Sequence, residues 1–187
     1  MHDTEPEHAK IYGYMRNIKP SEYFLTIICA IAGFGILNKL SELYIHSIEQ
    51  PIKAGQFKEM SELCISSPIP IALDEELIGV NSIEDKIKLI EEIKPQYIIL
   101  KPSLIGGFKS SEEWINILPK STKYWVTSAL ESNVGLSAIS QWVYTLNCSL
   151  PQGLGTGSLY SNNFSSPLSI KNAKLHYNKN NNWNIKI

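Results

Sequence analysis

Three ionisable residues of this chain stand at the ends of short apolar segments. They are Glu49 after YIHSI, Asp74 after IPIAL and Lys101 after YIIL, each spaced from the next by about one strand–helix unit. In a barrel of parallel strands, the side chains at the carboxyl ends of the strands converge on one mouth. Two carboxylates and a lysine at such a mouth are parts of a Mg²⁺-assisted proton-abstraction site.

The elements that must position these residues alternate between strand and helix from residue 39 onward. Strands are predicted at 24–30, 44–49, 69–73, 97–100, 123–128 and 148–152, and helices at 56–66, 82–93, 110–118 and 134–146. The strands are almost continuously apolar, which indicates burial on both faces of a parallel sheet. The first turn carries no dinucleotide fingerprint, so we expect a partial (β/α) TIM-type barrel in the α/β class, with about six strand–helix units.

Local signals support several of these boundaries. Ser82 and Asp85 form a Ser-x-x-Asp pattern that predicts a helix start, and Ser110 is predicted to cap the next helix. After Ser161, the alternating apolar residues of NAKLHYNKNNNWNIKI predict a hairpin or a strand packed outside the barrel. The asparagine run 180–182 is predicted to be a turn.

Composition excludes several classes of function. The chain has 187 residues, 43% of them hydrophobic and 19% charged, and a net charge of −1, so we expect no nucleic-acid partner and no anionic membrane. The three cysteines are widely spaced and form no CxxC pair, which favours a cytoplasmic protein without a zinc site or disulfide framework. The four histidines form no cluster. We expect His46 and Trp142 to have packing roles.

The segment YFLTIICAIAGFGIL (23–37) is the most hydrophobic part of the chain. Its length is below the roughly 20 residues that span a bilayer, and acidic residues precede it. We predict a buried strand followed by a turn. A short membrane-associated segment, or sequence without a place in the fold, stays open as an alternative.

Five ordered motifs together resemble one known family. They are IHSIEQPIKAGQ, PIALDEELIG, LKPSLIGGF, TSALESNVGLSAISQW and PQGLGTGSLY, from about Leu40 to about Pro167. The set is similar to the C-terminal barrel part of o-succinylbenzoate synthase, an enolase-superfamily enzyme of menaquinone biosynthesis. The resemblance implies a lyase that removes the proton α to a carboxylate and expels a hydroxyl to give 2-succinylbenzoate.

The resemblance also implies roles for particular residues. Glu49 and Asp74 match two of the family's Mg²⁺ ligands, and Lys101 matches a catalytic lysine that supplies positive charge near the intermediate. Taken singly, each could instead cap a helix, pair with a surface charge or lie as a lysine at a strand end. Glu75 could orient Lys101 or a metal ligand by accepting a hydrogen bond, or it could be solvated.

Two further loops are implied to contact the substrate, a small carboxylate. The expected residues are Ser128, Glu131 and Ser132 in one loop and Gly155, Thr156 and Gly157 in the glycine-rich turn. The turn is expected to offer backbone N–H groups at a helix start, which suits an anion. A tight structural turn is the alternative for this segment.

Other parts of the family pattern have no match in this sequence. The family's Lys-x-Lys strand is absent, and the aspartate expected near residues 29–33 is replaced by Cys-Ala-Ile-Ala-Gly. The capping domain also has no counterpart. We therefore expect a truncated form, with an atypical segment 1–38 and a partial barrel 39–187. The open barrel edge predicts self-association or a partner chain that covers it.

Two alternatives to the synthase stay open. One is another enolase-superfamily activity, such as N-acylamino-acid racemisation or dipeptide epimerisation, which needs two opposed lysines. The other is a non-catalytic remnant. The motifs SALES and GLGTGSLY favour the synthase, with impaired activity expected for the isolated chain.

Overall fold

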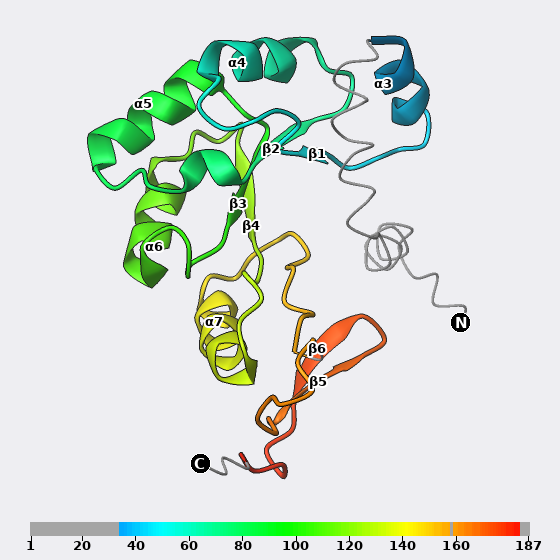
Figure 1. Cartoon of the computed structure of the whole chain (residues 1–187), viewed down its shortest axis with the longest axis vertical. Coiled ribbons are helices and arrows are strands. Elements are labelled where there is room, and N and C mark those ends of the chain that lie inside the picture. Colours follow the sequence, from blue (N-terminus) through cyan, green and yellow to red (C-terminus); the bar gives the residue numbers. More distant parts are fainter. Residues whose placement is uncertain (1–33, 158, 184–187) are drawn as a thin grey trace.

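The computed structural model describes residues 34–157 and 159–183, shown as coloured ribbon in Figure 1. The helices are α3 (Phe34–Ser41), α4 (Phe57–Ser66), η2 (Glu75–Leu77), α5 (Ile83–Ile93), α6 (Gly107–Ile117) and α7 (Asn133–Thr145). The strands are β1 (Ile48–Glu49), β2 (Ile71–Leu73), β3 (Tyr97–Leu100), β4 (Lys123–Val126), β5 (Leu168–Lys171) and β6 (Lys174–Tyr177).

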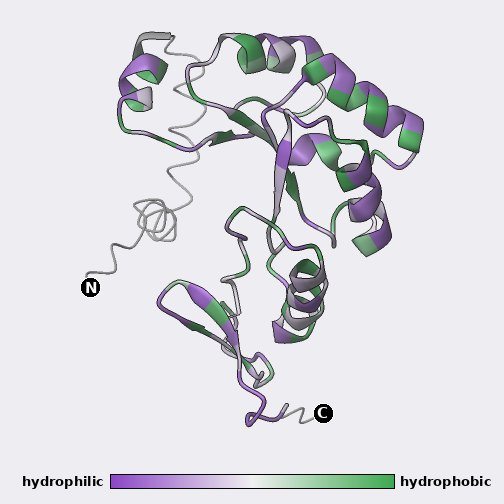
Figure 2. Cartoon of the chain, turned by 180° about the vertical axis from the view of Figure 1, so that it is seen from behind, coloured by the Kyte–Doolittle hydropathy of each residue, from purple (hydrophilic) through white to green (hydrophobic). Residues whose placement is uncertain are grey.

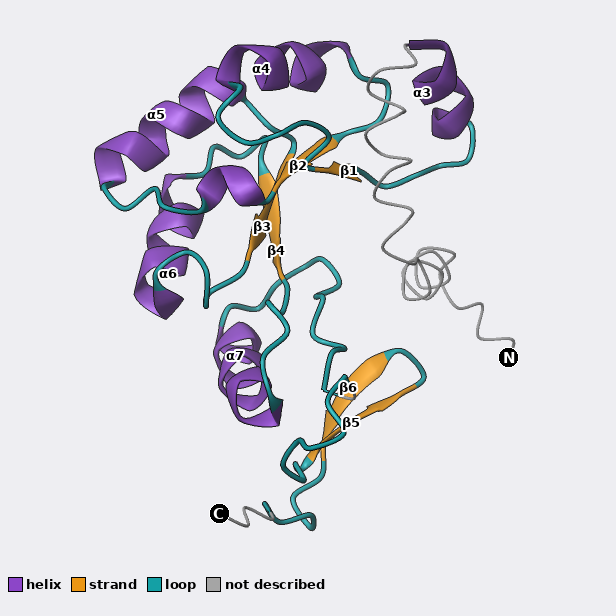
Figure 3. Cartoon of the chain, in the orientation of Figure 1, coloured by secondary structure: helices purple, strands orange, loops and turns teal. Residues whose placement is uncertain are grey.

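The first four strands form one parallel sheet in the order β1-β2-β3-β4. Ile48 pairs with Ile71, Ala72 with Tyr97, and the pairing of β3 with β4 runs along their whole length. A helix connects each strand to the next, and these helices lie along one side of the sheet (Figures 1 and 3). This arrangement is part of a (β/α) barrel, as the sequence predicted.

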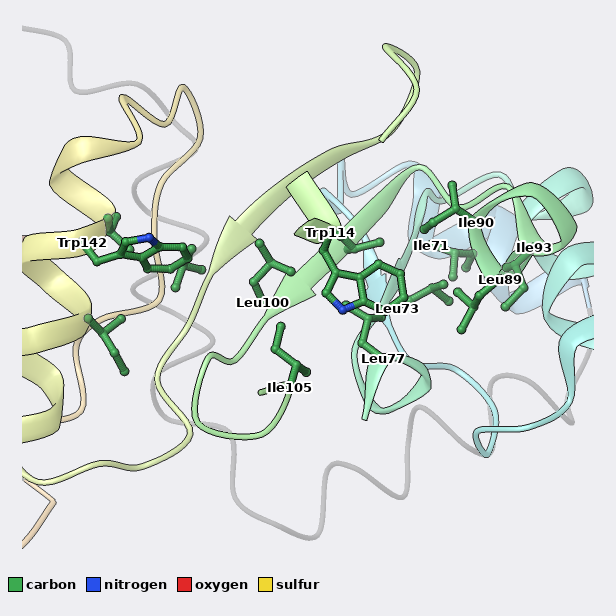
Figure 4. Close-up of a cluster of buried hydrophobic side chains, with 14 of the residues drawn as sticks. Ile71, Leu73, Leu77, Leu89, Ile90, Ile93, Leu100, Ile105, Trp114 and Trp142 are labelled. Carbon is green, nitrogen blue, oxygen red and sulfur yellow. The ribbon is translucent and has the colours of Figure 1, made fainter. Parts of the chain in front are cut away.

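The main hydrophobic core lies between the sheet and α4, α5 and α6. Alternate strand residues such as Leu73 and Leu100 point toward the helices, where Met60, Ile93 and Trp114 are fully buried. Figure 4 shows side chains from the strands and helices meeting around the Trp114 indole. The helices are amphipathic, and each carries hydrophobic and hydrophilic stripes in Figure 2. Burial of the apolar stripes against the sheet holds the helices and strands in their relative positions.

The opposite face of the sheet carries a smaller apolar cluster. Ala72, Ile99 and Trp125 are buried there. The ring of His46 lies 4.6 Å from that of Tyr97 and 5.7 Å from that of Trp125, measured between centroids. The packing role predicted for His46 is therefore confirmed. Trp142 is also buried, and it stacks on Phe108 at 5.0 Å.

The helix boundaries follow the local signals with one exception. The Ser82 hydroxyl accepts a hydrogen bond from the Asp85 backbone N–H at 3.0 Å, which confirms the predicted cap of α5. The Ser110 cap predicted for α6 is wrong, because this helix begins earlier, after Gly106. Gly106 has a φ of 95°, which glycine adopts without strain, and this turn starts the helix at Gly107.

The predicted strand 148–152 is not present as a strand. Within residues 34–157 and 159–183, the sheet extends beyond β4 by an isolated parallel bridge between Thr127 and Gly153. A C-terminal hairpin of antiparallel β5 and β6 is present, but it does not turn at the asparagine run around which the sequence pattern placed it. Its turn is at Asn172 and Ala173, which both have positive φ, and the asparagine run lies after β6. These two residues form a two-residue hairpin loop, which lies N-terminal to the asparagine run.

The N-terminal prediction lies mostly outside the described residues. This holds for the strand at 24–30 and for the position near 29–33 where the family has an aspartate. The last part of the segment 23–37 is described, and α3 replaces the turn that we predicted there. Within the described residues, no helix is both long and apolar enough to cross a membrane.

Candidate active site

The carboxyl ends of β1, β2 and β3 bring Glu49, Asp74 and Lys101 together. Glu49 is the last residue of β1, and Asp74 and Lys101 directly follow β2 and β3. The Lys101 ammonium forms an ion pair with Asp74 Oδ2, and Lys101 Nζ lies 3.6 Å from Glu49 Oε1. Parallel strand order explains this convergence, because the carboxyl ends of neighbouring parallel strands lie at the same edge of the sheet. The predicted group of three side chains is therefore assembled.

The three side chains differ in their exposure to solvent. The Asp74 side chain is 4% exposed, that of Lys101 20% and that of Glu49 37%. Burial and, to a smaller extent, the charge of Asp74 raise the pKa of Glu49, Lys101 opposes the change, and the resulting pKa is about 7. Burial tends to lower the pKa of Lys101, but the hydrogen bond and charge of Asp74 outweigh burial, so this pKa is raised. Lys101 is therefore a cation at neutral pH.

The raised pKa of Glu49 predicts a pH-dependent effect of Glu49→Gln on the metal-free chain. The folded state binds the proton of the Glu49 carboxyl more tightly than the unfolded state does. Protonation of Glu49 therefore stabilises the fold fully below the ordinary carboxyl pKa, and this stabilisation is lost as pH rises through about 7. We expect Glu49→Gln to raise the free energy of unfolding at about pH 8 by about 1 kcal/mol, because solvent screens this partly exposed group. At about pH 5 the effect should be smaller.

Urea denaturation at the two pH values measures this difference. Glu92→Gln on the exposed face of α5 is the matched control and should change stability equally at both. An effect of Glu49→Gln that does not depend on pH would contradict the raised pKa of Glu49.

Two residues that the sequence analysis missed hold this site in place. The Gln50 side-chain oxygen accepts a hydrogen bond from the Asp74 backbone N–H at 3.0 Å, and its amide donates to the Ile52 carbonyl at 3.0 Å. Glu76 is buried and accepts a hydrogen bond from the Gly55 N–H at 2.9 Å. Gln50 also has a φ of 39°, an unusual backbone conformation that its surroundings must stabilise. The only signal in the sequence was that a polar residue directly follows Glu49.

The orienting role considered for Glu75 remains a prediction. Its side chain is exposed, and within the described part of the chain it forms no ion pair or hydrogen bond with Lys101. Its charge nevertheless raises the pKa of both Lys101 and Glu49. The neighbouring Glu76 is the buried residue that bonds to the backbone here, because the η2 turn directs residue 75 outward.

The loop after β4 holds Ser128 and Glu131 together. The Ser128 hydroxyl donates to Glu131 Oε2 at 2.7 Å, and the Ala129 N–H donates to the same oxygen at 2.8 Å. Burial tends to raise the pKa of Glu131, but the hydrogen bonds from Ser103, Ser128 and Ala129 outweigh burial, so this pKa is lowered. Ser132 precedes α7, but its exposed side chain makes no capping bond. The expected substrate contacts of these residues remain predictions.

The glycine-rich turn packs tightly against the rest of the chain, and no helix starts in its described residues. Gly153 N–H donates to the Val126 carbonyl at 2.8 Å, and Ser128 N–H donates to the Gly153 carbonyl at 3.1 Å. The expected helix start is therefore wrong. The glycines are needed for close approach: a Cβ on Gly157 would lie 2.6 Å from Asn133 Oδ1. Substrate contacts of Gly155, Thr156 and Gly157 remain predictions.

Gly153→Ala is expected to destabilise the chain. The added Cβ would lie 2.5 Å from Thr127 Oγ1 and 2.8 Å from Thr127 Cβ, at the bridge that extends the sheet. Overpacking of this kind typically costs about 1–3 kcal/mol, which thermal or urea denaturation can measure. Gly155→Ala is the control, because its Cβ would meet only Ile170 Cδ1 at 3.6 Å, an ordinary contact. Equal effects of the two substitutions would contradict the packing reason.

The donor atoms of the site fit a divalent cation with two protein ligands. Glu49 and Asp74 supply hard carboxylate oxygens, which Mg²⁺ prefers. Burial and the nearby charge of Asp74 together raise the pKa of Glu49, and the positive charge of Lys101 does not fully offset them. Among the described residues, no three His, Cys, Asp or Glu side chains group closely enough to hold a metal ion.

Known proteins share the sequence and arrangement of these elements, although no protein-family model matches the chain. The o-succinylbenzoate synthase of Desulfotalea psychrophila is 51% identical over 140 residues, which are 74% of this chain and 38% of that protein. The crystal structure of MenC from the same organism has 50% identity and a TM-score of 0.72, over 76% of this chain and 40% of its own.

A more distant solved structure has the same fold. Muconate cycloisomerase from Pseudomonas fluorescens is 27% identical, with a TM-score of 0.62 over 71% of this chain and 37% of its own. The chain thus spans less than half the length of each of these proteins. Over the matched segment it is a homologue of o-succinylbenzoate synthase and has the strand–helix architecture of the enolase superfamily.

Proposed function

We propose that this chain carries part of the active site of an o-succinylbenzoate synthase, a lyase of menaquinone biosynthesis in the cytoplasm. The observation that supports this most is the assembly of Glu49, Asp74 and Lys101 at one edge of the parallel sheet. It lies in a chain that is 51% identical to such a synthase over 140 residues. The expected substrate is a small cyclohexadiene carboxylate with a succinyl arm.

In this reaction the carbon α to the carboxylate loses a proton, the neighbouring hydroxyl leaves as water, and the ring becomes aromatic. The difficulty is the negative charge that develops on the carboxylate oxygens after proton loss. Lys101 carries a positive charge at neutral pH and can stabilise that charge electrostatically. Because its ammonium is held by Asp74, we assign it this role rather than that of the base.

Glu49 and Asp74 would hold a divalent metal, for which we propose Mg²⁺. When bound, the metal supplies Lewis-acid stabilisation of a substrate carboxylate. Gln50 keeps the backbone of Asp74 in place through its hydrogen bond at 3.0 Å, so the two carboxylates stay on the same side of the mouth. Lys101 would orient the Asp74 carboxylate through their ion pair and would supply a positive charge at the site.

A direct assay tests the proposal. The purified chain is mixed with Mg²⁺ and the cyclohexadiene substrate, and the aromatic product is followed by ultraviolet absorbance. We expect Mg²⁺-dependent turnover that Asp74→Asn abolishes. The rate should be below that of a complete synthase by a factor of about 10²–10⁴, the usual contribution of a positioned base.

Two further measurements separate the alternatives. Titration calorimetry with Mg²⁺ and 2-succinylbenzoate should show binding that Asp74→Asn weakens. An N-acylamino acid in place of the substrate tests for racemisation. Racemisation without dehydration would contradict the proposal, and so would the absence of both turnover and binding.

A further inference from the structure

The carboxylate of Glu131 connects two loops at the mouth of the partial barrel. Its Oε1 accepts a hydrogen bond from the Ser103 hydroxyl at 2.5 Å, in the loop after β3. Its Oε2 accepts from the Ser128 hydroxyl at 2.7 Å and from the Ala129 N–H at 2.8 Å, in the loop after β4. Both carboxylate oxygens are therefore engaged with the protein itself.

Ser128 extends this connection to the glycine-rich turn. Its hydroxyl accepts hydrogen bonds from the Leu130 N–H at 2.9 Å and from the Thr156 hydroxyl at 2.6 Å, while it donates to Glu131. A serine hydroxyl has one donor and two acceptor positions, so all three are used. Ser128 is also buried. A substrate contact through this hydroxyl would therefore require one of these hydrogen bonds to break.

The backbone around Glu131 is arranged to keep this geometry. Leu130 has a φ of 68°, which is strained for leucine, and its carbonyl accepts a hydrogen bond from the Tyr160 hydroxyl at 2.7 Å. Gly135 lies inside α7, where glycine is unfavourable, but a Cβ there would lie 2.9 Å from Glu131 Cβ. The helix thus leaves space for the Glu131 side chain.

We propose that Glu131 is a positioning residue that holds the loop of Lys101 against the loop after β4 and, through Ser128, against the glycine-rich turn. Ser103 follows Lys101 in a turn whose Leu104 N–H donates to the Lys101 carbonyl at 2.8 Å. Glu131 therefore acts on the lysine through this turn and does not contact the substrate. The relevance of this role to catalysis depends on the proposed function.

Hydrogen exchange of the backbone amides in the full chain tests the connection without requiring activity. The variants are Glu131→Gln, Ser103→Ala, their combination and Ser103→Thr, with Glu92→Gln as an exposed control. Loss of a hydrogen bond to a charged group should speed exchange in residues 101–106 about tenfold or more in both single variants. The combination should add little, and Ser103→Thr, which keeps the hydroxyl, should resemble the original chain.

Exchange in 101–106 that is unchanged by Glu131→Gln would overturn the proposal. Additive effects in the combined variant would also overturn it, because the two residues would then act separately. Ser103 is exposed, so its replacement tests the connection even where Glu131→Gln lowers overall stability. The NMR signal of the Lys101 side chain gives a local readout, which we expect to shift equally in the two single variants.

Titration with 2-succinylbenzoate distinguishes positioning from direct contact. If Glu131 positions the loops, both Glu131→Gln and Ser103→Ala should weaken binding, and Glu131→Gln by the larger factor because it also affects the hydrogen bond to Ser128. Weaker binding in Glu131→Gln alone would indicate a direct substrate contact and contradict the proposal. If the original chain binds no 2-succinylbenzoate, the proposed function loses its support, while hydrogen exchange still decides the role of Glu131.

Discussion

Lys101→Met is expected to remove most of the activity and to destabilise the metal-free chain. The ammonium of Lys101 pairs with Asp74, whose side chain is 4% exposed, and lies 3.6 Å from Glu49. Breaking a buried pair by removing one partner typically costs about 3–5 kcal/mol, because a buried charge is left without compensation. Since Lys101 and Glu49 are partly exposed, we expect about 2 kcal/mol here. Urea denaturation at about pH 8 measures it.

The effect of Lys101→Met on turnover should be larger than its effect on folding. Loss of a preorganised electrostatic contact in an active site typically lowers kcat by about 10²–10³. Mg²⁺ should restore part of the stability of the variant, since a second cation can then compensate Asp74, but it should not restore turnover. Lys58→Met on exposed α4 is the control. A variant that is as stable and as active as this control would contradict the assigned role.

Lys86→Met is expected to destabilise the contact between α5 and α6 by about 2 kcal/mol. The Lys86 side chain is fully buried, and its ammonium donates to Ser110 Oγ at 2.7 Å and to Glu113 Oε2 at 2.8 Å. It also lies 5.6 Å from the centroid of the Trp114 ring. Methionine fills a similar volume, so the expected loss comes from hydrogen bonds to a charged group and from the unpaired Ser110 hydroxyl.

Thermal and urea denaturation of a small set of variants checks this reason. Lys88→Met lies on the exposed side of the same helix and should have little effect. Adding Ser110→Ala to Lys86→Met should recover part of the lost stability, because the unpaired hydroxyl is then removed. If the double variant is less stable than Lys86→Met alone, the explanation by an unpaired polar group is wrong.

Much of the fold was predictable because local patterns agreed with one another. β3 lies at the predicted residues 97–100, and α5 begins at the predicted Ser82 cap. The hydrophobic periodicity of each helix specified which face would meet the sheet. Predictions failed where a turn decided the boundary, as at Gly106, whose φ of 95° starts α6 before Ser110.

The candidate site was predictable only in part, and the reason is the distance along the chain between partners. Glu49, Asp74 and Lys101 were found because strand ends in a parallel sheet meet at one edge. Gln50 was missed because its partner, the Asp74 backbone, is 24 residues away, and Glu76 because Gly55 is 21 residues away. Such hydrogen bonds leave no periodic signal.

The sequence by itself determined the alternation of strands and helices, the parallel sheet and the identity of the three charged residues at its edge. Only the tertiary structure decided that Glu131 and Ser128 bond to each other and to neighbouring loops, and that Gly153 fits against Thr127. Hydrophobic pattern and strand order act along the chain and can be recognised locally. Hydrogen-bond saturation and close packing depend on which distant atoms become neighbours after folding.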